Sequence, residues 1–484
     1  MDLTLFWEIL HLWETVFGGL IYIRVFNSGQ NILLEEIRAV QTFVLCFFFK
    51  VFFLLLSNGS AGLIGTETIK EGDTQLLGLK PIVNNGNVFR AVSSMKWPGK
   101  AATRIAVVWF SKNTDLRIPI ILDGKHVNII DEFLTEKSVA VDIKPRKLIN
   151  GLEGGIGSDN SKGESLLLEQ GNDWLNKLRE SGVEYCRQYV TGDDLTSHGF
   201  QNSSRWVVDV QGDSLEEIKN KSHLTYKYLL DVVKPIRTPE YLSSQTGLEE
   251  RWWQLWRARE SLYKKIRENK SCIIMPVVSK YLLAKRVPTE WVFTNKFIVL
   301  VETRNDLLLI LSSNISDIWF RRFSGTLGET LSLSVTKALN TFPLPSTDAS
   351  ADEQLIDKFV KIRESWIVEN QKGFTELYNK YHEKNNADKR ISMLRNIHVA
   401  IDQYVLGIYG WDDIQSKFDF YDTPQGTRFT ISEATRQDVL VRLLALNHER
   451  YEKEVRLGLH DKKKKGKGGK GKNPKNNDEQ MELF

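Results

Sequence analysis

The chain has 484 residues, of which 42% are hydrophobic and 26% are charged, and this excludes a mainly disordered or collagen-like protein. The formal net charge is only +4, although eight lysines lie between Lys462 and Lys475. Without those eight the net charge would be −4, so the positive charge belongs to the tail. Any nucleic-acid footprint in the body must therefore be a local patch.

The cysteines and histidines give no support for a metal site. Cys46, Cys186 and Cys272 are far apart and form no CxxC pair, which argues against a disulfide framework or a zinc site. The eight histidines form no HExxH or HxH pattern, and the sequence contains no Walker A or GxSxG motif. We therefore predict no metal site and no self-contained hydrolase or kinase, and we expect a cytoplasmic location.

The first 59 residues differ in character from the rest of the chain. Thr42–Leu56 is a run of 15 mainly apolar residues interrupted by Lys50, whereas a membrane span needs about 20. Glu8 and Glu14 precede this run, where a signal peptide would have basic residues. Three interpretations remain: a membrane anchor, a buried helix, or a translated stretch that is not native protein. We favour the third and expect no contact with a membrane.

From residue 61 onward the pattern is that of an α/β protein. Ala61–Gly65 is a short apolar run that predicts a buried strand, and Ile69–Val83 has helical spacing. Val88–Val92 and Arg104–Phe110 are strand-like segments around a Pro-Gly loop, which predicts a hairpin. Ile118–Leu122 is a further predicted strand.

Gly62–Phe110 resembles the segment that follows the N-P-P-[FY] motif in MmeI-like type IIG restriction–modification DNA methyltransferases. The resemblance implies an α/β fold class: the C-terminal part of a Rossmann-like methyltransferase domain, a mixed α/β target recognition domain and a C-terminal helical segment. Trp97 lies in the loop that faces the substrate base in such enzymes. It is a candidate for base stacking, although packing of the indole on the sheet is the interpretation we favour.

The catalytic motif of that family is missing from the chain as written, which contains no N-P-P. A shifted reading frame permits F-D-A-I-L-G-N-P-P-F-M-G-D-S over Asp2–Val16 and N-Q-G-S-A-D-L-C-A over Glu36–Leu45. In N-P-P-[FY], the Asn side chain and the first Pro carbonyl accept hydrogen bonds from the adenine amine, while the aromatic ring stacks on the flipped-out base. We therefore expect a frameshift, and we assign no catalytic or cofactor-binding residue to this chain.

Two polar segments follow the predicted strands. Gly151–Ser165 is rich in Gly, Ser and Asp and predicts a linker. Tyr189–Leu195 and Ser204–Asp209 resemble the connector of the same family. The paired acids Asp193 and Asp194 are compatible with a metal or a general base, but no third ligand lies at useful spacing, so a helix cap or a turn is favoured.

An aromatic and basic cluster follows at Glu250–Arg259. Trp252 and Trp256 are four residues apart and would share one face of a helix. Their neighbours Arg257 and Arg259 are candidate DNA-binding residues, because guanidinium groups and aromatic rings both lie readily on nucleic acid. An aromatic docking face between domains is the alternative, and it is favoured.

Cys272–Pro345 resembles the target recognition domain of the family, including its closing T-F-P-x-P at Thr341–Pro345. The segment reads as strands followed by mixed strand and helix, with cationic residues between apolar ones. Such residues bind phosphates without sequence preference, whereas Arg or Lys that reaches guanine carries specificity. A solvated charged face is the alternative for any one of them. The candidate DNA-binding residues in this segment are Lys280, Lys285, Arg286, Lys296, Arg304, Arg321 and Arg322.

The remainder is predicted to be helical. Asp348–Leu459 has helical apolar spacing, and Arg428–Val455 resembles the C-terminal helical segment of the family. His398 and His448 lie among apolar neighbours, so we expect core or hydrogen-bonding roles for them rather than metal ligation. Lys462–Lys475 is a low-complexity basic tail that should bind DNA phosphates weakly.

The resemblance implies the C-terminal part of a site-specific DNA adenine-N6 methyltransferase of a restriction–modification or phage-defence system, and we expect no catalysis by this chain alone. Its partners would be double-stranded DNA and an upstream methyltransferase half. S-adenosylmethionine would serve the complete enzyme, and we expect none to bind this chain alone. The alternatives are a non-catalytic DNA-specificity module and a membrane-anchored binding protein. The expected divisions are a frame-shifted segment (1–59), methyltransferase strands (60–150), linker and connector (151–235), target recognition domain (236–347), helical domain (348–460) and basic tail (461–484).

Overall fold

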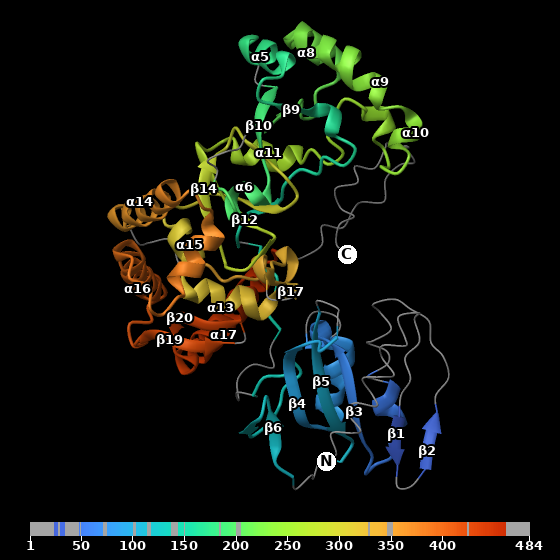
Figure 1. The fold of residues 1–484 in the computed structure, drawn as a ribbon, viewed down its shortest axis with the longest axis vertical. Helices are drawn as coiled ribbons and strands as arrows, with labels where there is room; N and C mark the ends of the chain where they lie inside the picture. The colour runs from blue at the N-terminus through green and yellow to red at the C-terminus, as the bar shows by residue number, and fades with distance from the viewer. Residues whose placement is uncertain are drawn as a thin grey trace.

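The computed structural model describes residues 24–27, 30–33, 48, 50–70, 75–99, 103–113, 118–136, 144–149, 151–182, 185–199, 205–327, 330–345, 352–423 and 425–460. The fold is mixed α/β, with several small sheets and the longest helices toward the C-terminus. Figure 1 shows the N-terminal elements up to β7 set apart from a larger body that contains the sheets and helices from β8 onward. The buried side chains follow this division, because the N-terminal sheet and the body have separate hydrophobic cores. The basic tail lies outside the described residues.

The N-terminal sheet has the strand order β3-β5-β4-β6-β7. Both β3 (Ser60–Thr66) and β4 (Asn87–Lys96) pair antiparallel with β5 (Arg104–Ser111), so β3 and β4 run in the same direction. β6 (Ile120–Leu122) pairs parallel with β4, and β7 (Lys125–Val127) closes the edge. The predicted strands and the predicted hairpin are confirmed.

The single helix expected over Ile69–Val83 is wrong. The structure has three short pieces instead: η1 (Glu67–Lys70), η2 (Gln75–Leu79) and α4 (Lys80–Asn85). η2 and α4 adjoin without a gap, and Pro81 lies in the first turn of α4, where its missing backbone N–H removes one hydrogen bond of a regular helix. The apolar spacing still reports burial correctly, since Ile69, Leu79 and Ile82 are fully buried in the N-terminal core.

The end of the apolar run near residue 50 packs into the same core. Residues 50–54 are helical, and Phe48, Val51, Phe52 and Leu55 are buried while Lys50 is exposed. The ring of Phe52 lies 6.0 Å from that of Phe110 on β5. This part of the run therefore takes the buried-helix alternative. Within the described part of the chain, no helix combines the length and apolarity needed to cross a membrane.

Upstream of this helix, the described residues form one hairpin, β1 (Arg24–Asn27) with β2 (Gln30–Leu33). Residues 42–47 and most of residues 1–41 lie outside the described part of the chain. The frameshift concerns the nucleotide sequence and stays a prediction.

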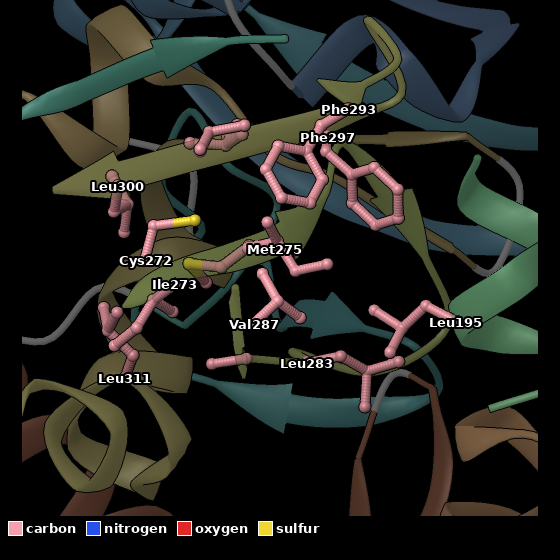
Figure 2. Close-up of a cluster of buried hydrophobic side chains, with 14 of the residues drawn as sticks. Leu195, Cys272, Ile273, Met275, Leu283, Val287, Phe293, Phe297, Leu300 and Leu311 are labelled. Atoms are coloured by element: carbon pink, nitrogen blue, oxygen red, sulfur yellow. The ribbon is translucent and has the colours of Figure 1, made fainter. Parts of the chain in front are cut away.

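The body is built on an antiparallel sheet of order β14-β12-β16-β8. Its central strands β12 (Ser271–Pro276) and β16 (Phe297–Val301) are almost wholly buried, and β14 (Lys285–Pro288) lies beside β12. Figure 2 shows side chains from these three strands, among them Met275, Val287 and Phe297, meeting in one cluster. The predicted strands after residue 272 are confirmed.

The expected linker at Gly151–Ser165 is instead part of this sheet. Its residues Gly154–Ile156 form β8, which pairs antiparallel with β16. A Cβ atom at Gly154 would lie 2.3 Å from the carbonyl oxygen of Val299. The glycine therefore permits close approach of two backbones within a sheet. In the sequence, such a glycine cannot be told apart from a glycine in a flexible linker.

A second sheet of order β15-β10-β11-β9 lies next to the first. β10 (Cys186–Val190) pairs antiparallel with β11 (Arg205–Val208) and parallel with β15 (Val292–Phe293), so it ties the connector to the region after residue 272. The fourth strand is β9 (Leu167–Glu169). The helices of this part are α5 (Asp173–Glu180), α6 (Gly192–Thr196), α7 (Leu215–Lys221), α8 (His223–Tyr228), α9 (Lys234–Ile236), α10 (Pro239–Leu242) and α11 (Glu260–Ile266).

The C-terminal part of the body is mainly helical, as predicted. It is preceded by the helices α12 (Leu307–Ser312) and α13 (Asn314–Phe323) and by a small sheet of β13 (Val278–Ser279), β18 (Thr330–Ser332) and β17 (Gly325–Leu327). Its own helices are α14 (Glu353–Asn370), α15 (Phe374–Tyr381), α16 (Lys389–Tyr409) and α17 (Glu433–Arg456). One element was not predicted: the hairpin of β19 (Phe418–Thr423) and β20 (Gly426–Ile431), which turns at Gly426 with φ +95°.

Candidate DNA interface

Three of the cationic residues predicted to bind DNA are paired with carboxylates inside the body. Lys285 Nζ lies 2.5 Å from Glu364 Oε1, and burial lowers the pKa of this amine. The Arg286 side chain on β14 donates a hydrogen bond of 2.7 Å to Glu302, which directly follows β16. Arg304 forms a two-pronged pair with Asp306 and donates to the Pro345 carbonyl at 2.8 Å. Each charge is thus compensated within the fold.

Arg321 and Arg322 are adjacent on α13 and so point in different directions. Arg321 donates to Asp317, one helical turn earlier, at 2.8 Å. Arg322 Nη2 lies 3.4 Å from Asp131 Oδ2, and its guanidinium group lies 3.6 Å from the ring centroid of Phe133. Arg322 therefore joins the body to the segment after the N-terminal sheet.

Lys280 and Lys296 complete the predicted set in this region. Lys280 donates to Asn379 Oδ1 at 2.9 Å, which links the region after β12 to α15. Lys296 lies on the turn that leads into β16 and is exposed. Of these seven predicted residues, Lys296 presents the most accessible charge, because the others are half-buried against partners.

The aromatic cluster at Trp252–Trp256 is not helical, which corrects the expected helical face. The backbone carbonyls of Trp252 and Gln254 accept hydrogen bonds from the buried guanidinium group of Arg237, so they are used by a side chain rather than by a helix. Trp252 and Trp253 meet edge to face at 5.7 Å.

The two arginines of this cluster have local roles in the structure. The guanidinium group of Arg257 lies 4.3 Å from the ring centroid of Trp256. Arg259 precedes α11 in a left-handed conformation with φ +60°. Both side chains are half-buried. Their contact with DNA stays a prediction.

Trp97 occupies the position that the packing interpretation gives it. Its side chain is 4% exposed and packs with Ile105 and Val107 of β5. A Cβ atom at Gly99 would lie 2.4 Å from the indole nitrogen, so the loop folds tightly over the ring. Stacking on a base would require the indole to leave this position.

The acids and histidines singled out from the sequence have structural roles. Asp194 caps α6, because its Oδ2 accepts from the Thr191 backbone N–H at 2.7 Å, and it also pairs with Arg205. His398 Nε2 lies 3.1 Å from the Tyr378 hydroxyl, and His448 Nε2 lies 2.9 Å from the Lys144 carbonyl oxygen. The predicted cap and hydrogen-bonding roles are confirmed. Within the described part of the chain, no group of three His, Cys, Asp or Glu side chains is arranged to hold a metal ion.

A cavity of about 70 Å³ brings Arg321 together with two cationic residues that sequence reasoning missed, Arg428 of β20 and Arg436 of α17. The sequence placed both in a helical segment and gave no reason to single them out. Burial lowers the pKa of His398, which lines the cavity, to about 3, and it raises the pKa of Asp402, on the same helix, to about 7.

Neither of two cavities among the described residues fits S-adenosylmethionine. A cavity of about 70 Å³ is far below the roughly 300 Å³ at which small-molecule sites begin. A second cavity, of about 330 Å³, is lined by polar residues such as Arg187, Asp209 and Lys221 near β10 and β11. Those strands are antiparallel, so the cavity lacks the strand–glycine loop–helix arrangement that cradles such a cofactor. No reaction step is therefore derived through this cofactor.

Comparison with known proteins agrees with this architecture. The solved structure of the type IIL restriction–modification enzyme MmeI in complex with DNA is similar to this chain, with a TM-score of 0.52 and 15% identity. The similarity covers 82% of this chain and 50% of that chain, and at this identity it concerns the fold alone. The type IIG restriction endonuclease BpuSI gives a TM-score of 0.29 at 12% identity over 86% of this chain and 53% of that chain, which is too low to indicate a shared fold. The chain thus spans about half the length of each.

The comparison with curated proteins gave no match. The sequence family described as "MmeI, target recognition domain" matches residues 135–346, which include β8 to β18 and α5 to α13. The matched region takes in both central sheets of the body and all seven cationic candidates between Lys280 and Arg322. Over residues 135–346 this chain is therefore similar in sequence to the family described as the MmeI target recognition domain.

Proposed function

We propose that the chain recognises specific sequences in double-stranded DNA as the specificity portion of a restriction–modification protein. The observation that carries this proposal is the family match over residues 135–346. Its two sheets and the helices after them form one continuous core, so the recognition domain and the C-terminal helices would move on DNA as a unit. The fold similarity to MmeI, whose structure was solved with DNA, supports the same conclusion.

The complete protein is proposed to be an adenine-N6 methyltransferase that uses S-adenosylmethionine. The support for this assignment is the sequence resemblance of Gly62–Phe110 to the segment that follows N-P-P-[FY] in this family. That segment forms β3, β4 and β5 of the N-terminal sheet, in which β3 and β4 run in the same direction with the antiparallel β5 between them. The cofactor site and the N-P-P-F motif would then come from an upstream half, and the protein would work in the cytoplasm.

A non-catalytic specificity module is the second candidate. It is favoured by the family match, which covers a target recognition domain over residues 135–346 and no catalytic domain. The two candidates differ in what an upstream half would restore.

The test begins with the nucleotide sequence upstream of Met1 and across the first 60 codons. An overlapping frame that encodes N-P-P-F and a cofactor motif should restore adenine methylation of duplex DNA when its product is expressed together with this chain. Calorimetry on this chain alone should show no S-adenosylmethionine binding. Micromolar binding of S-adenosylmethionine to this chain alone would contradict the proposal that an upstream half supplies the cofactor site. Absence of such a frame would favour the non-catalytic module.

A further inference from the structure

The cavity that contains Arg321 lies where two parts of the body meet. Its lining comes from the recognition domain, through Tyr281 and α13, and from the C-terminal part, through α15, β20 and α17. Three guanidinium groups line it, those of Arg321, Arg428 and Arg436, whereas Asp317 is the one carboxylate among the described lining residues. Positive charge is therefore in excess in this cavity.

The three arginines are not equally compensated. Arg321 is paired with Asp317 at 2.8 Å, and Arg436 lies 3.6 Å from Glu433 on the exposed side of α17. Arg428 is only 8% exposed, and none of the ion pairs between described residues includes it. Its hydrogen-bond partner is the Gln425 carbonyl oxygen at 3.3 Å.

The ring of Tyr281 lies 4.5 Å from the Arg428 guanidinium group and compensates its charge only in part. Asp317 also attracts the Arg428 charge without forming an ion pair with it, and Arg321 repels it. A buried charge without a direct ion pair is costly, and this burial lowers the pKa of the Arg428 guanidinium.

A second observation also indicates a missing partner. Ser312 Oγ lines the cavity and is buried, yet it has no hydrogen-bond partner among the described residues. Buried hydroxyl groups are normally satisfied, so an unpaired one needs an explanation. The two imidazoles in the lining, His382 and His398, have pKa values below their ordinary range because of burial, so they add no charge near neutral pH.

We propose that this cavity is an anion site that holds one phosphate group, with Arg428 as its principal donor and Arg321 and Ser312 as further donors. A guanidinium fork matches two oxygens of a phosphate, and charge-assisted hydrogen bonds are the strong ones. A volume of about 70 Å³ suits a single tetrahedral oxyanion and is too small for a nucleotide.

The bound group is either a phosphate of the DNA backbone or a free phosphate ion. The first of these assignments rests on the proposed function. The chemistry of recognition is the same in both cases. A bound backbone phosphate would connect the recognition domain and the C-terminal segment at one point on the DNA, because Arg321 and Arg428 come from the two parts.

The first arm of the test uses inorganic phosphate and the full chain. Phosphate should raise the thermal midpoint above that in sodium chloride of equal ionic strength, because a ligand that binds only the folded state stabilises it. Arg428→Gln should abolish this shift, and Ser312→Ala, which removes one oxygen, should reduce it. Arg442→Gln is the matched control, since Arg442 lies on α17 outside the cavity and pairs with Asp413. It should leave the phosphate shift intact.

The second arm measures DNA affinity against salt concentration. If the phosphate is that of the DNA backbone, Arg428→Gln should reduce the slope of log affinity against log salt by about 1, and Arg428→Lys should retain most of it. An unchanged slope together with a phosphate-dependent thermal shift assigns the site to free phosphate. Failure of both arms overturns the site. If the wild-type chain binds no DNA, the proposed function is overturned. The thermal shift with inorganic phosphate would still show whether the cavity binds an anion.

Discussion

The guanidinium group of Arg322 lies 3.6 Å from the ring centroid of Phe133, and its Nη2 lies 3.4 Å from Asp131 Oδ2. This contact joins α13 of the recognition domain to the turn that follows the N-terminal sheet. Burial lowers the pKa of the Arg322 guanidinium, and its side chain is only 15% exposed. In this structure the Arg322 guanidinium group contacts Asp131 and Phe133 within the molecule and is not exposed for contact with DNA.

Arg322→Ala should therefore reduce stability. Removing one partner of a mostly buried pair and a cation–π contact should lower the free energy of unfolding by about 1–3 kcal/mol. The measurement is urea unfolding followed by intrinsic fluorescence. The matched control is Arg442→Ala, whose pairs with Asp413 and Asp438 are largely exposed, and it should cost less than about 1 kcal/mol. Equal effects of the two substitutions would contradict the structural role of Arg322.

The N-terminal segment should divide into a dispensable part and a packed part. Deletion of Met1–Leu45 should leave the melting temperature nearly unchanged, because a frame-shifted peptide has no evolved packing partner. Phe52→Ala should instead cost about 3–5 kcal/mol, because Phe52 is 4% exposed and packs on Phe110. Calorimetry of both variants checks the division. Loss of cooperative unfolding on deletion of the first 45 residues would mean that they belong to a native core.

Asp402 should make stability depend on pH. Burial raises the pKa of its carboxyl from 3.8 to about 7, since Oδ2 is buried without a hydrogen-bond partner among the described residues. Its contribution to stability is full below pH 3.8. As pH rises from 3.8 to 7, the unfolded chain ionises first and stability falls.

Asp402→Asn removes this loss and keeps an oxygen for the Asn314 backbone N–H. One pKa unit corresponds to about 1.4 kcal/mol, so the stability of the variant relative to wild type should rise by more than about 1 kcal/mol between pH 5 and pH 7.5. Urea unfolding at both pH values measures the difference. His398, one turn earlier on α16, titrates in both proteins and cancels in the comparison. A difference that does not change with pH would show that Asp402 is already ionised.

The basic tail and the exposed Lys296 should contribute nonspecific affinity for DNA. Deleting Lys462–Lys475 removes eight positive charges and should flatten the dependence of log affinity on log salt, while discrimination between DNA sequences survives. Lys296→Ala should reduce the slope by about 1 if this residue contacts a phosphate. Fluorescence anisotropy over a salt series measures both. Loss of all binding on deletion of the tail would show that the body does not read DNA.

Local patterns in the sequence predicted much of the fold. Two strand-like segments around a Pro-Gly loop located the hairpin of β4 and β5, and helical spacing located the C-terminal helices. The failures have different local causes. Gly154 permits close strand approach rather than flexibility, and the carbonyls near Trp252 are bound by the guanidinium group of Arg237.

The candidate site was less accessible from the sequence. Cationic residues were visible, but their partners were not, because Glu364 and Asp131 lie far from Lys285 and Arg322 along the chain. A charge that reads as available in sequence is compensated once distant segments come together. Arg428 is the converse case: it received no attention in sequence, and the structure leaves its guanidinium group without a carboxylate partner among the described residues.

Selection of bound duplexes from a random DNA pool by the purified chain tests the central claim most directly. The proposed specificity role predicts that one short sequence is enriched and that anisotropy then gives at least about tenfold tighter binding to it than to a scrambled duplex at physiological salt. The enrichment should persist in the variant that lacks Lys462–Lys475. If Arg321 contacts a base, Arg321→Ala should weaken binding to the enriched sequence by about 1–3 kcal/mol. A pool that remains random, with equal affinity for every duplex, would contradict the account.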